Sequence, residues 1–202
     1  MATLNTSRSE AMPRKYQFTY DYYESNVPLY ERYLAHLKAR KCRILEIGAL
    51  EGGSTTWLID NILSHEDSLI DTIDVYEQPN LMPNLKTTGQ INKVKFHLGP
   101  SAVILRSLPL GAYDFAIIDG SHWTINVLED MVLAFRLLKV GGLMETDDYI
   151  WDDPAYNQEG APKAAVDAFL SIYSAKLKII RPEGFEDGKL WIEKIADPMY
   201  GF

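Results

Sequence analysis

Four side chains suited to chemistry follow two apolar segments of the chain. Asp119 and His122 belong to one Asp-Gly-Ser-His sequence, and Asp147 and Asp148 come directly after a later apolar segment. Carboxylates that meet repel one another unless a cation joins them, and hard ions such as Mg²⁺ or Ca²⁺ prefer such oxygen ligands. Imidazole titrates near neutral pH, so His122 could act as a general base. These residues could bind a divalent cation and remove a proton, provided that the fold brings the two segments together.

A second candidate site lies in residues 43–54, with the sequence RILEIGALEGGS. Its apolar run predicts a buried strand that breaks at Gly48, and a helical pattern begins after the Gly-Gly-Ser sequence. Such a strand, turn and helix form half of a βαβ unit, where a ligand lies over the strand end and against the helix N-terminus. Glycines allow the backbone to approach a ligand closely. Glu46 is a carboxylate in a strand otherwise built for burial, so it needs a partner.

The elements that must position these residues alternate along the chain. Strands are predicted at 43–47, 69–75, 94–98, 113–119, about 142–146, 177–180 and 190–195. Helices are predicted at about 27–40, 54–63, 102–108, 124–138 and from Pro162, with a loop or broken helix at 77–90 and a candidate active-site loop at 150–161. No helix fits between the last two strands, so these strands must pair antiparallel.

Bulk properties limit the class of protein. A chain of 202 residues suits one domain, and we expect an N-terminal arm or lid over 1–25 and a single domain over 26–202. A net charge of −8 disfavours a nucleic-acid surface. No apolar run approaches the ~20 residues of a membrane helix, the N-terminus lacks the core of a signal peptide, and the lone Cys42 fits a reducing cytosol. We therefore expect a cytoplasmic protein with a small-molecule substrate and neither a nucleic-acid nor a membrane partner.

Aromatic residues gather near the N-terminus. They are Tyr16, Phe18, Tyr20, Tyr22 and Tyr23. The segment could be a lid over an aromatic or amphipathic substrate, it could pack on the body of the domain, or it could form a homo-oligomer contact. Aromatic rings are common in cores and interfaces, which favours packing or an oligomer contact.

The spacing E-x-G-x-x-x-G-G-S over residues 46–54 resembles motif I of class I S-adenosylmethionine (SAM)-dependent methyltransferases, in the variant of the small methyltransferase 24 group. The resemblance covers roughly residues 40–196. It implies an α/β, Rossmann-like fold with a seven-stranded, mostly parallel sheet in the order 3-2-1-4-5-7-6, strand seven antiparallel and helices on both faces. An NAD-binding Rossmann domain would end in a sixth parallel strand instead, and the glycine spacing is not GxGxxG.

The resemblance also implies a SAM site. Asp74 could accept both ribose hydroxyls or be a solvated strand-end residue, and its position after motif I favours the ribose role. Ser101 would lie near the adenine. The residues implied to bind SAM are Glu46, Gly48, Ala49, Gly52, Ser54, Asp74, Val75, Ser101, Asp119 and His122.

The four residues of the opening motif are similar to the metal site of the sugar O-methyltransferases of macrolide biosynthesis. There, an Asp after strand four and an acidic pair after strand five hold Mg²⁺, and a His three residues after the first Asp is the proposed base. The match implies Asp119, Asp147 and Asp148 as metal ligands and His122 and Asp119 as catalytic residues. A plainer interpretation remains open, in which the turn shapes the cofactor pocket, Asp147 caps a turn and Asp148 pairs with a base such as Lys163.

The expected function is SAM-dependent methylation of a hydroxyl on a small molecule, assisted by a divalent metal. The chain has no [DN]PP[YF] sequence after strand four, which disfavours the enzymes that methylate amino groups of bases and glutamine. The alternatives are a non-methylating reaction on the same fold, a non-catalytic SAM-binding module, and an NAD-type oxidoreductase. A carboxyl edge blocked by the N-terminal arm would favour the non-catalytic module.

Overall fold

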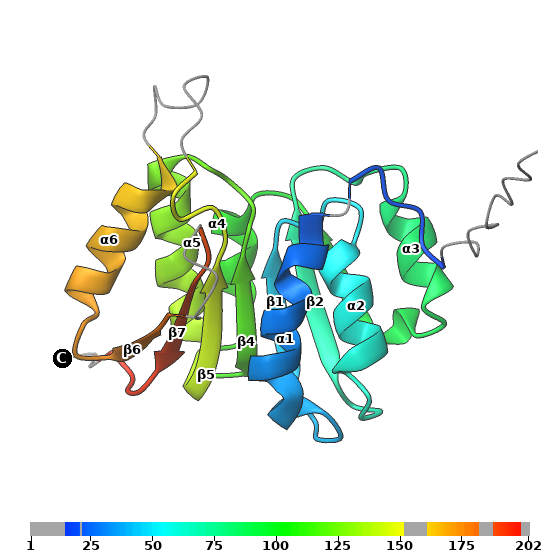
Figure 1. Ribbon diagram of the computed structural model, residues 1–202, viewed down its shortest axis with the longest axis horizontal. Coiled ribbons are helices and arrows are strands. Elements are labelled where there is room, and N and C mark those ends of the chain that lie inside the picture. The colour runs from blue at the N-terminus through cyan, green and yellow to red at the C-terminus, as the bar shows by residue number, and fades with distance from the viewer. Residues whose placement is uncertain (1–14, 21, 152–160, 182–187, 199–202) are drawn as a thin grey trace, which may run out of the picture.

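The computed structural model describes residues 15–20, 22–151, 161–181 and 188–198, which form a seven-stranded sheet with helices on both faces (Figure 1). The strands are β1 (Arg43–Ile47), β2 (Leu69–Asp74), β3 (Val94–Leu98), β4 (Tyr113–Ile118), β5 (Leu138–Thr146), β6 (Leu177–Ile180) and β7 (Leu190–Lys194). Their order is β3-β2-β1-β4-β5-β7-β6. The first five are parallel, and β7 runs antiparallel to both β5 and β6. The predicted fold, strand order and terminal hairpin are confirmed.

The helices also follow the prediction, with shifted ends. They are α1 (Val27–Leu34), α2 (Gly53–Asn61), α3 (Leu81–Thr87), α4 (Ser101–Ile104), α5 (Thr124–Leu137) and α6 (Pro162–Ile172), with 3-10 turns η1 (Tyr22–Asn26), η2 (Ala35–Leu37), η3 (Ile91–Lys93) and η4 (Leu105–Ser107). The first predicted helix is shorter because η2 follows α1 and Ala39 has a positive φ of 62°. Most of the loop predicted at 150–161 lies outside the described residues. Within the described ranges, no helix combines the length and apolar character needed to cross a membrane.

Two apolar layers hold the helices against the sheet. Leu45 on β1 packs toward α5 and α6, whereas its neighbour Ile44 packs toward α1 and α2. Successive side chains of a strand point to opposite faces, so Glu46 falls on the same face as Ile44. The central strand β4 is buried at every position, as expected for a parallel strand covered on both sides.

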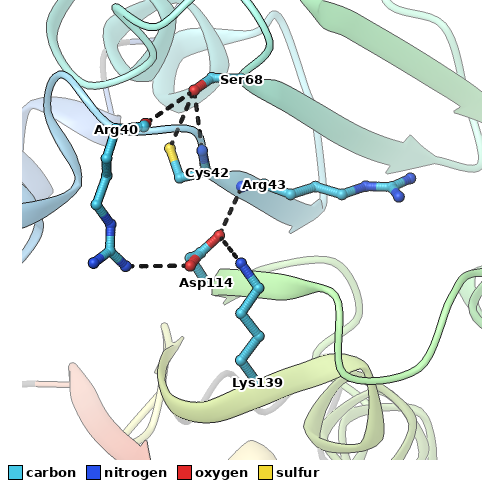
Figure 2. A network of polar contacts seen from close by, with 6 residues as sticks. All are labelled: Arg40, Cys42, Arg43, Ser68, Asp114 and Lys139. Carbon is cyan, nitrogen blue, oxygen red and sulfur yellow. Dashed lines mark hydrogen bonds and ion pairs between the residues drawn. The ribbon is translucent and has the colours of Figure 1, made fainter.

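A polar network ties the amino-terminal edge of the sheet together (Figure 2). The buried Asp114 accepts hydrogen bonds from the backbone N of Arg43 at 2.9 Å and from Nζ of Lys139 at 2.8 Å, and it pairs with Arg40 at 3.3 Å. The Ser68 hydroxyl donates to the Arg40 carbonyl at 3.3 Å. These contacts join β1, β4 and the start of β5 at the edge opposite to the one that carries the candidate site.

A buried lysine fastens α5 to β7. Lys194 has a fully buried side chain, and its Nζ donates to the carbonyl oxygens of Phe135 at 3.0 Å and Leu138 at 2.7 Å. It also pairs with Asp197 at 2.7 Å. The last carbonyls of a helix have no partner within the helix, so this ammonium group caps α5.

Replacement of Lys194 should therefore destabilise the fold. We expect Lys194→Met, which keeps the aliphatic volume, to lower the free energy of unfolding by about 2–4 kcal/mol, because buried carbonyls lose their donor. Urea denaturation followed by circular dichroism measures the loss. Lys163→Met is the matched control, since it removes an exposed pair with Asp167 and a surface contact with the Tyr149 ring, and it should change little. Equal, small losses in both variants would contradict the capping role.

Candidate functional site

A cavity of about 440 Å³ lies over the carboxyl ends of β1 and β2 and beside the turn after β4. The structure brings five of the predicted cofactor residues into its lining: Gly48, Asp74, Val75, Ser101 and His122. Its size is that of a small-molecule site, and ligands of open α/β sheets bind outside the carboxyl ends of the strands. We call it the larger cavity.

Asp74 supports the glycine turn as well as lining the larger cavity. Its carboxylate accepts hydrogen bonds from the backbone N–H groups of Ala49 at 3.0 Å, Leu50 at 2.9 Å and Tyr76 at 3.0 Å. A carboxylate has about four acceptor positions, so capacity remains for a ligand hydroxyl. Asp74 is thus not a merely solvated strand end.

The backbone conformation and close packing of the turn require glycine at several positions. Gly48 has a φ of 98°, and a Cβ placed on it would lie 1.9 Å from the carbonyl oxygen of Asp119. A Cβ on Gly53 would lie 2.4 Å from a ring carbon of Tyr23. Gly52 precedes α2 with a φ of 82°, and it lines neither of the two cavities described for this part of the chain. Close packing within the chain, more than access for a ligand, explains the glycines.

A smaller cavity of about 60 Å³ lies on the other side of Gly48, which lines both cavities. It contains the other predicted cofactor residues Glu46, Ala49, Ser54 and Asp119, together with Asp147. Its opposite wall consists of the aromatic residues Phe18, Tyr20, Tyr22 and Tyr23. The two cavities together therefore contain every predicted cofactor residue except Gly52.

The N-terminal segment 15–20, which we call the strap, is bound to the body of the domain. The side chain of Asn84 accepts from the backbone N of Gln17 at 2.9 Å and donates to its carbonyl at 2.8 Å. The Thr19 hydroxyl donates to Glu51 at 2.8 Å, and both Asn84 and Glu51 are buried. Figure 1 shows this blue segment running from α3 toward the top of α1. The strap packs on the domain, as one of the sequence alternatives expected.

Glu46 is fully buried under the smaller cavity. Its carboxylate accepts hydrogen bonds from the hydroxyls of Thr55 and of Thr72, the latter at 2.7 Å. Burial raises the pKa of Glu46 to about 7, although the two hydroxyls oppose that rise. The partner that the sequence required is thus a pair of neutral donors from α2 and β2.

Three of the predicted catalytic and metal residues meet after β4 and β5. One ligand atom each from Asp119, His122 and Asp148 lies within 4.8 Å of the others. Nε2 of His122 is 2.7 Å from Oδ2 of Asp148, and the His122 ring stacks on Trp151 with centroids 4.4 Å apart. The hydrogen bond to Asp148 raises the pKa of His122. This group of residues could hold a metal ion or act as a proton acceptor.

Asp147 does not join this group, although the sequence placed it among the metal ligands. Both of its carboxylate oxygens bind Nζ of Lys189, at 2.9 and 3.0 Å, and both side chains are largely buried. The pKa of Asp119 is raised well above its usual range. The first cause is the removal of its carboxyl group from water, and the second is the charge of Asp147 and Asp148, although the residue as a whole is exposed. Lys163 pairs with Asp167, whereas the alternative interpretation paired it with Asp148.

Sequence reasoning missed Asp130 of α5, which lines the larger cavity near Ser101. The sequence contains an indication of this role, because Asp130 shares the apolar face of α5 with Val127, Met131 and Ala134. An acid in an apolar helical stripe needs either a partner or a function.

The raised pKa of Glu46 makes stability depend on pH. The native pKa of about 7 exceeds the ordinary value of 4.5, so the native state binds more protons between these pH values. The stability due to the neutral carboxyl is fully present below about pH 4.5 and is lost as the pH rises through 7. We expect Glu46→Gln to reduce the loss of stability between pH 5 and pH 8, by on the order of a few kcal/mol.

Urea titrations of the cofactor-free protein measure this effect. The exposed Glu66→Gln variant is the control and should keep the wild-type pH dependence. If Glu46→Gln keeps it as well, the carboxyl of Glu46 is not responsible.

Comparison with known proteins places this geometry in a family. Residues 45–149, just over half of the chain, match the methyltransferase 24 family, described as a methyltransferase domain. No curated protein matches the chain.

Several solved structures share the fold. A Klebsiella pneumoniae protein, described as a candidate O-methyltransferase, is 24% identical with a TM-score of 0.63, over 87% of this chain and 79% of that one. The O-methyltransferase TomG of tomaymycin synthesis from Streptomyces achromogenes, solved with SAM, is 20% identical with a TM-score of 0.66, over 86% and 80%.

The methyltransferase MycE of the mycinamycin pathway, solved with Mg, S-adenosylhomocysteine (SAH) and mycinamycin VI, is 19% identical with a TM-score of 0.62. The match covers 88% of this chain but only 51% of MycE. The matched family segment contains the glycine turn, Asp74, the turn from Asp119 to His122, and Asp148, and the sheet has the strand order expected for this fold. The chain therefore belongs to the methyltransferase 24 family of class I SAM-dependent methyltransferases.

Proposed function

We propose that this protein transfers the methyl group of SAM to a hydroxyl group of a small molecule. The observation that carries the proposal is the pair of His122 and Asp148, with Nε2 and Oδ2 2.7 Å apart, in which His122 lines the larger cavity. Asp119, in the same group, lines the smaller cavity. A proton acceptor thus stands where the two cavities approach each other. The names of TomG and of the Klebsiella protein, both O-methyltransferases in their descriptions, agree with this proposal.

The residues present fit SAM. The larger cavity combines apolar walls, such as Ile73 and Pro100, with polar groups at its ends, such as Asp74 and Ser101, which suits a nucleoside. Gly48 lines both cavities, so the methionine part would extend past it toward Glu46 and Ser54. The acidic lining suits a cation, and SAM carries a sulfonium and an ammonium group.

Asp148 would orient His122 for proton removal. Because Nε2 of His122 faces the Asp148 carboxylate, a neutral His122 would donate there and offer Nδ1 as the acceptor. Stacking on Trp151 fixes the plane of the ring. When bound, SAM supplies an electrophilic methyl group whose carbon–sulfur bond breaks as the acceptor oxygen attacks the methyl carbon. The protein contributes positioning, a proton acceptor on His122 and exclusion of water.

A divalent metal would be held by Asp119 and Asp148, whose carboxylate oxygens lie close together beside His122, with His122 kept as the proton acceptor. Carboxylates suit a hard divalent ion, and such an ion would lower the pKa of a bound hydroxyl. Asp147 could join only by giving up Lys189. MycE was solved in complex with Mg, which is the precedent for a bound metal ion in this fold.

A second candidate function is a non-catalytic SAM-binding module. The observation in its favour is the strap, whose neighbouring aromatic residues wall the smaller cavity and leave it about 60 Å³. The two proposals separate experimentally, because the module would bind SAH yet form none from SAM with any acceptor.

Removal of His122 tests the catalytic proposal. With labelled SAM and a panel of phenols, catechols and sugars, we expect His122→Ala to lower the rate of SAH formation at saturating substrate by about 10²–10⁴-fold, the usual contribution of a general base. Asp148→Asn should lower it less, because the base remains but loses its orientation. His36→Ala, on the surface of η2, is the control and should keep the wild-type rate. An unchanged rate in His122→Ala would rule out the base.

Metal binding is tested on protein treated with a chelator. We expect calorimetry with MgCl₂ and MnCl₂ to detect one ion per chain, with affinity at least tenfold weaker in Asp148→Asn. Asp147→Asn should weaken it less, since Lys189 already binds that carboxylate. Full methyl transfer in the continued presence of chelator would remove the metal from the proposal.

A further inference from the structure

The buried face of α5 brings a carboxyl group to the larger cavity. Asp130 is only 2% exposed, yet it belongs to the lining of that cavity together with Ser101 and Ala102 of α4. Asp74 stands at the other polar position, at the end of β2 beside the glycine turn. The cavity therefore has one carboxylate at the β2 end and another where α4 meets α5.

Asp130 has unused capacity to accept hydrogen bonds. Burial raises its pKa to about 6, and a hydrogen bond with the Ser101 side chain opposes the rise. That hydroxyl fills one of about four acceptor positions on the carboxylate. A carboxyl group so far removed from water gains from each further N–H or O–H donor that a ligand brings.

The surroundings of Asp130 favour a flat ligand with an N–H donor. Pro100, Ala102 and Ile73 give apolar walls to the same cavity, and Trp123 adds an aromatic ring. Apolar walls around a buried acceptor suit a heteroaromatic ring that carries an amino group. The neighbouring Glu129 cannot serve, because its carboxylate is more exposed and binds Arg106 at 2.6 Å.

We propose that Asp130 accepts a hydrogen bond from the exocyclic amino group of adenine, and thereby selects adenine over a 6-oxopurine in the cofactor. Ser101 is positioned by the same carboxylate and closes this end of the pocket. The proposal rests on SAM occupying the larger cavity, and it is independent of the acceptor and of any metal. Asp130 would be a specificity residue that the sequence motifs of the family segment do not reveal.

The test compares two ligands by calorimetry: SAH, with the 6-amino group, and S-inosylhomocysteine, which carries a 6-oxo group instead. We expect the wild-type protein to bind SAH at least about tenfold more tightly, since the 6-oxo group of S-inosylhomocysteine places an acceptor where the amino group donates to the buried carboxylate. Asp130→Asn, whose amide can both accept and donate, should reduce the preference to within about threefold. Glu66→Gln, at an exposed position outside the residues described as lining either cavity, is the control and should keep the wild-type preference.

Each outcome of this comparison either supports or overturns the role of Asp130 in binding adenine. Equal wild-type affinity for the two ligands overturns the proposal without any variant, and so does an unchanged preference in a folded Asp130→Asn protein. Asp130→Ala replaces the Asn variant if that one does not fold, and it should lose the preference too. Binding of neither ligand by the wild-type protein would refute the placement of SAM itself, whereas binding of both without preference would refute only the role of Asp130.

Discussion

The close packing of two turns, one after β1 and one after β4, determines the geometry of the site. Hydrogen bonds of the sheet continue past the strands, from Gly48 N to the Ile73 carbonyl and from Asp119 N to the Ile47 carbonyl, both at 2.9 Å. The two backbones come so near that even a methyl group on Gly48 would overlap the Asp119 carbonyl. Asp119 and His122 are therefore held beside the glycine turn by the backbone, whatever their side chains bind.

This packing gathers acids around the cleft with few cations among them. The residues described as lining the two cavities include Glu46, Asp74, Asp119 and Asp130 but no Lys or Arg. Burial raises the pKa of Glu46 to about 7, although the hydroxyls of Thr55 and Thr72 donate to its carboxylate and oppose that rise. Such a lining attracts a cationic ligand and repels a pyrophosphate. The charge of the cleft therefore favours SAM over NAD on physical grounds, separately from the glycine spacing and the terminal hairpin.

The fold could be predicted from the sequence because it depends on local patterns. The apolar runs gave each strand to within a few residues, and the absence of a helix before β7 gave the antiparallel hairpin. The site was harder, since its contacts join distant segments. Lys189 reaches Asp147 only because β7 pairs with β5 in a register that sets Leu190 opposite Thr146, and no local pattern specifies that register. The burial of Asp130 could be inferred from the apolar face of α5, but its contact with Ser101 could not, because Ser101 lies on another helix.

The strap limits the space beside the glycine turn. Its backbone satisfies Asn84, and its hydroxyl at Thr19 satisfies Glu51, so two buried polar groups are complemented by a segment outside the sheet. Each such bond contributes on the order of 1 kcal/mol net, so displacing the strap costs about as much as a weak ligand can supply. Tyr23, which follows the strap, lies against Gly53 at the start of α2, in the wall of the smaller cavity. If the methionine part of SAM occupies this cavity as proposed, Phe18, Tyr20, Tyr22 and Tyr23 enclose the cofactor on this side, and the acceptor must approach from the side of His122 and Trp151.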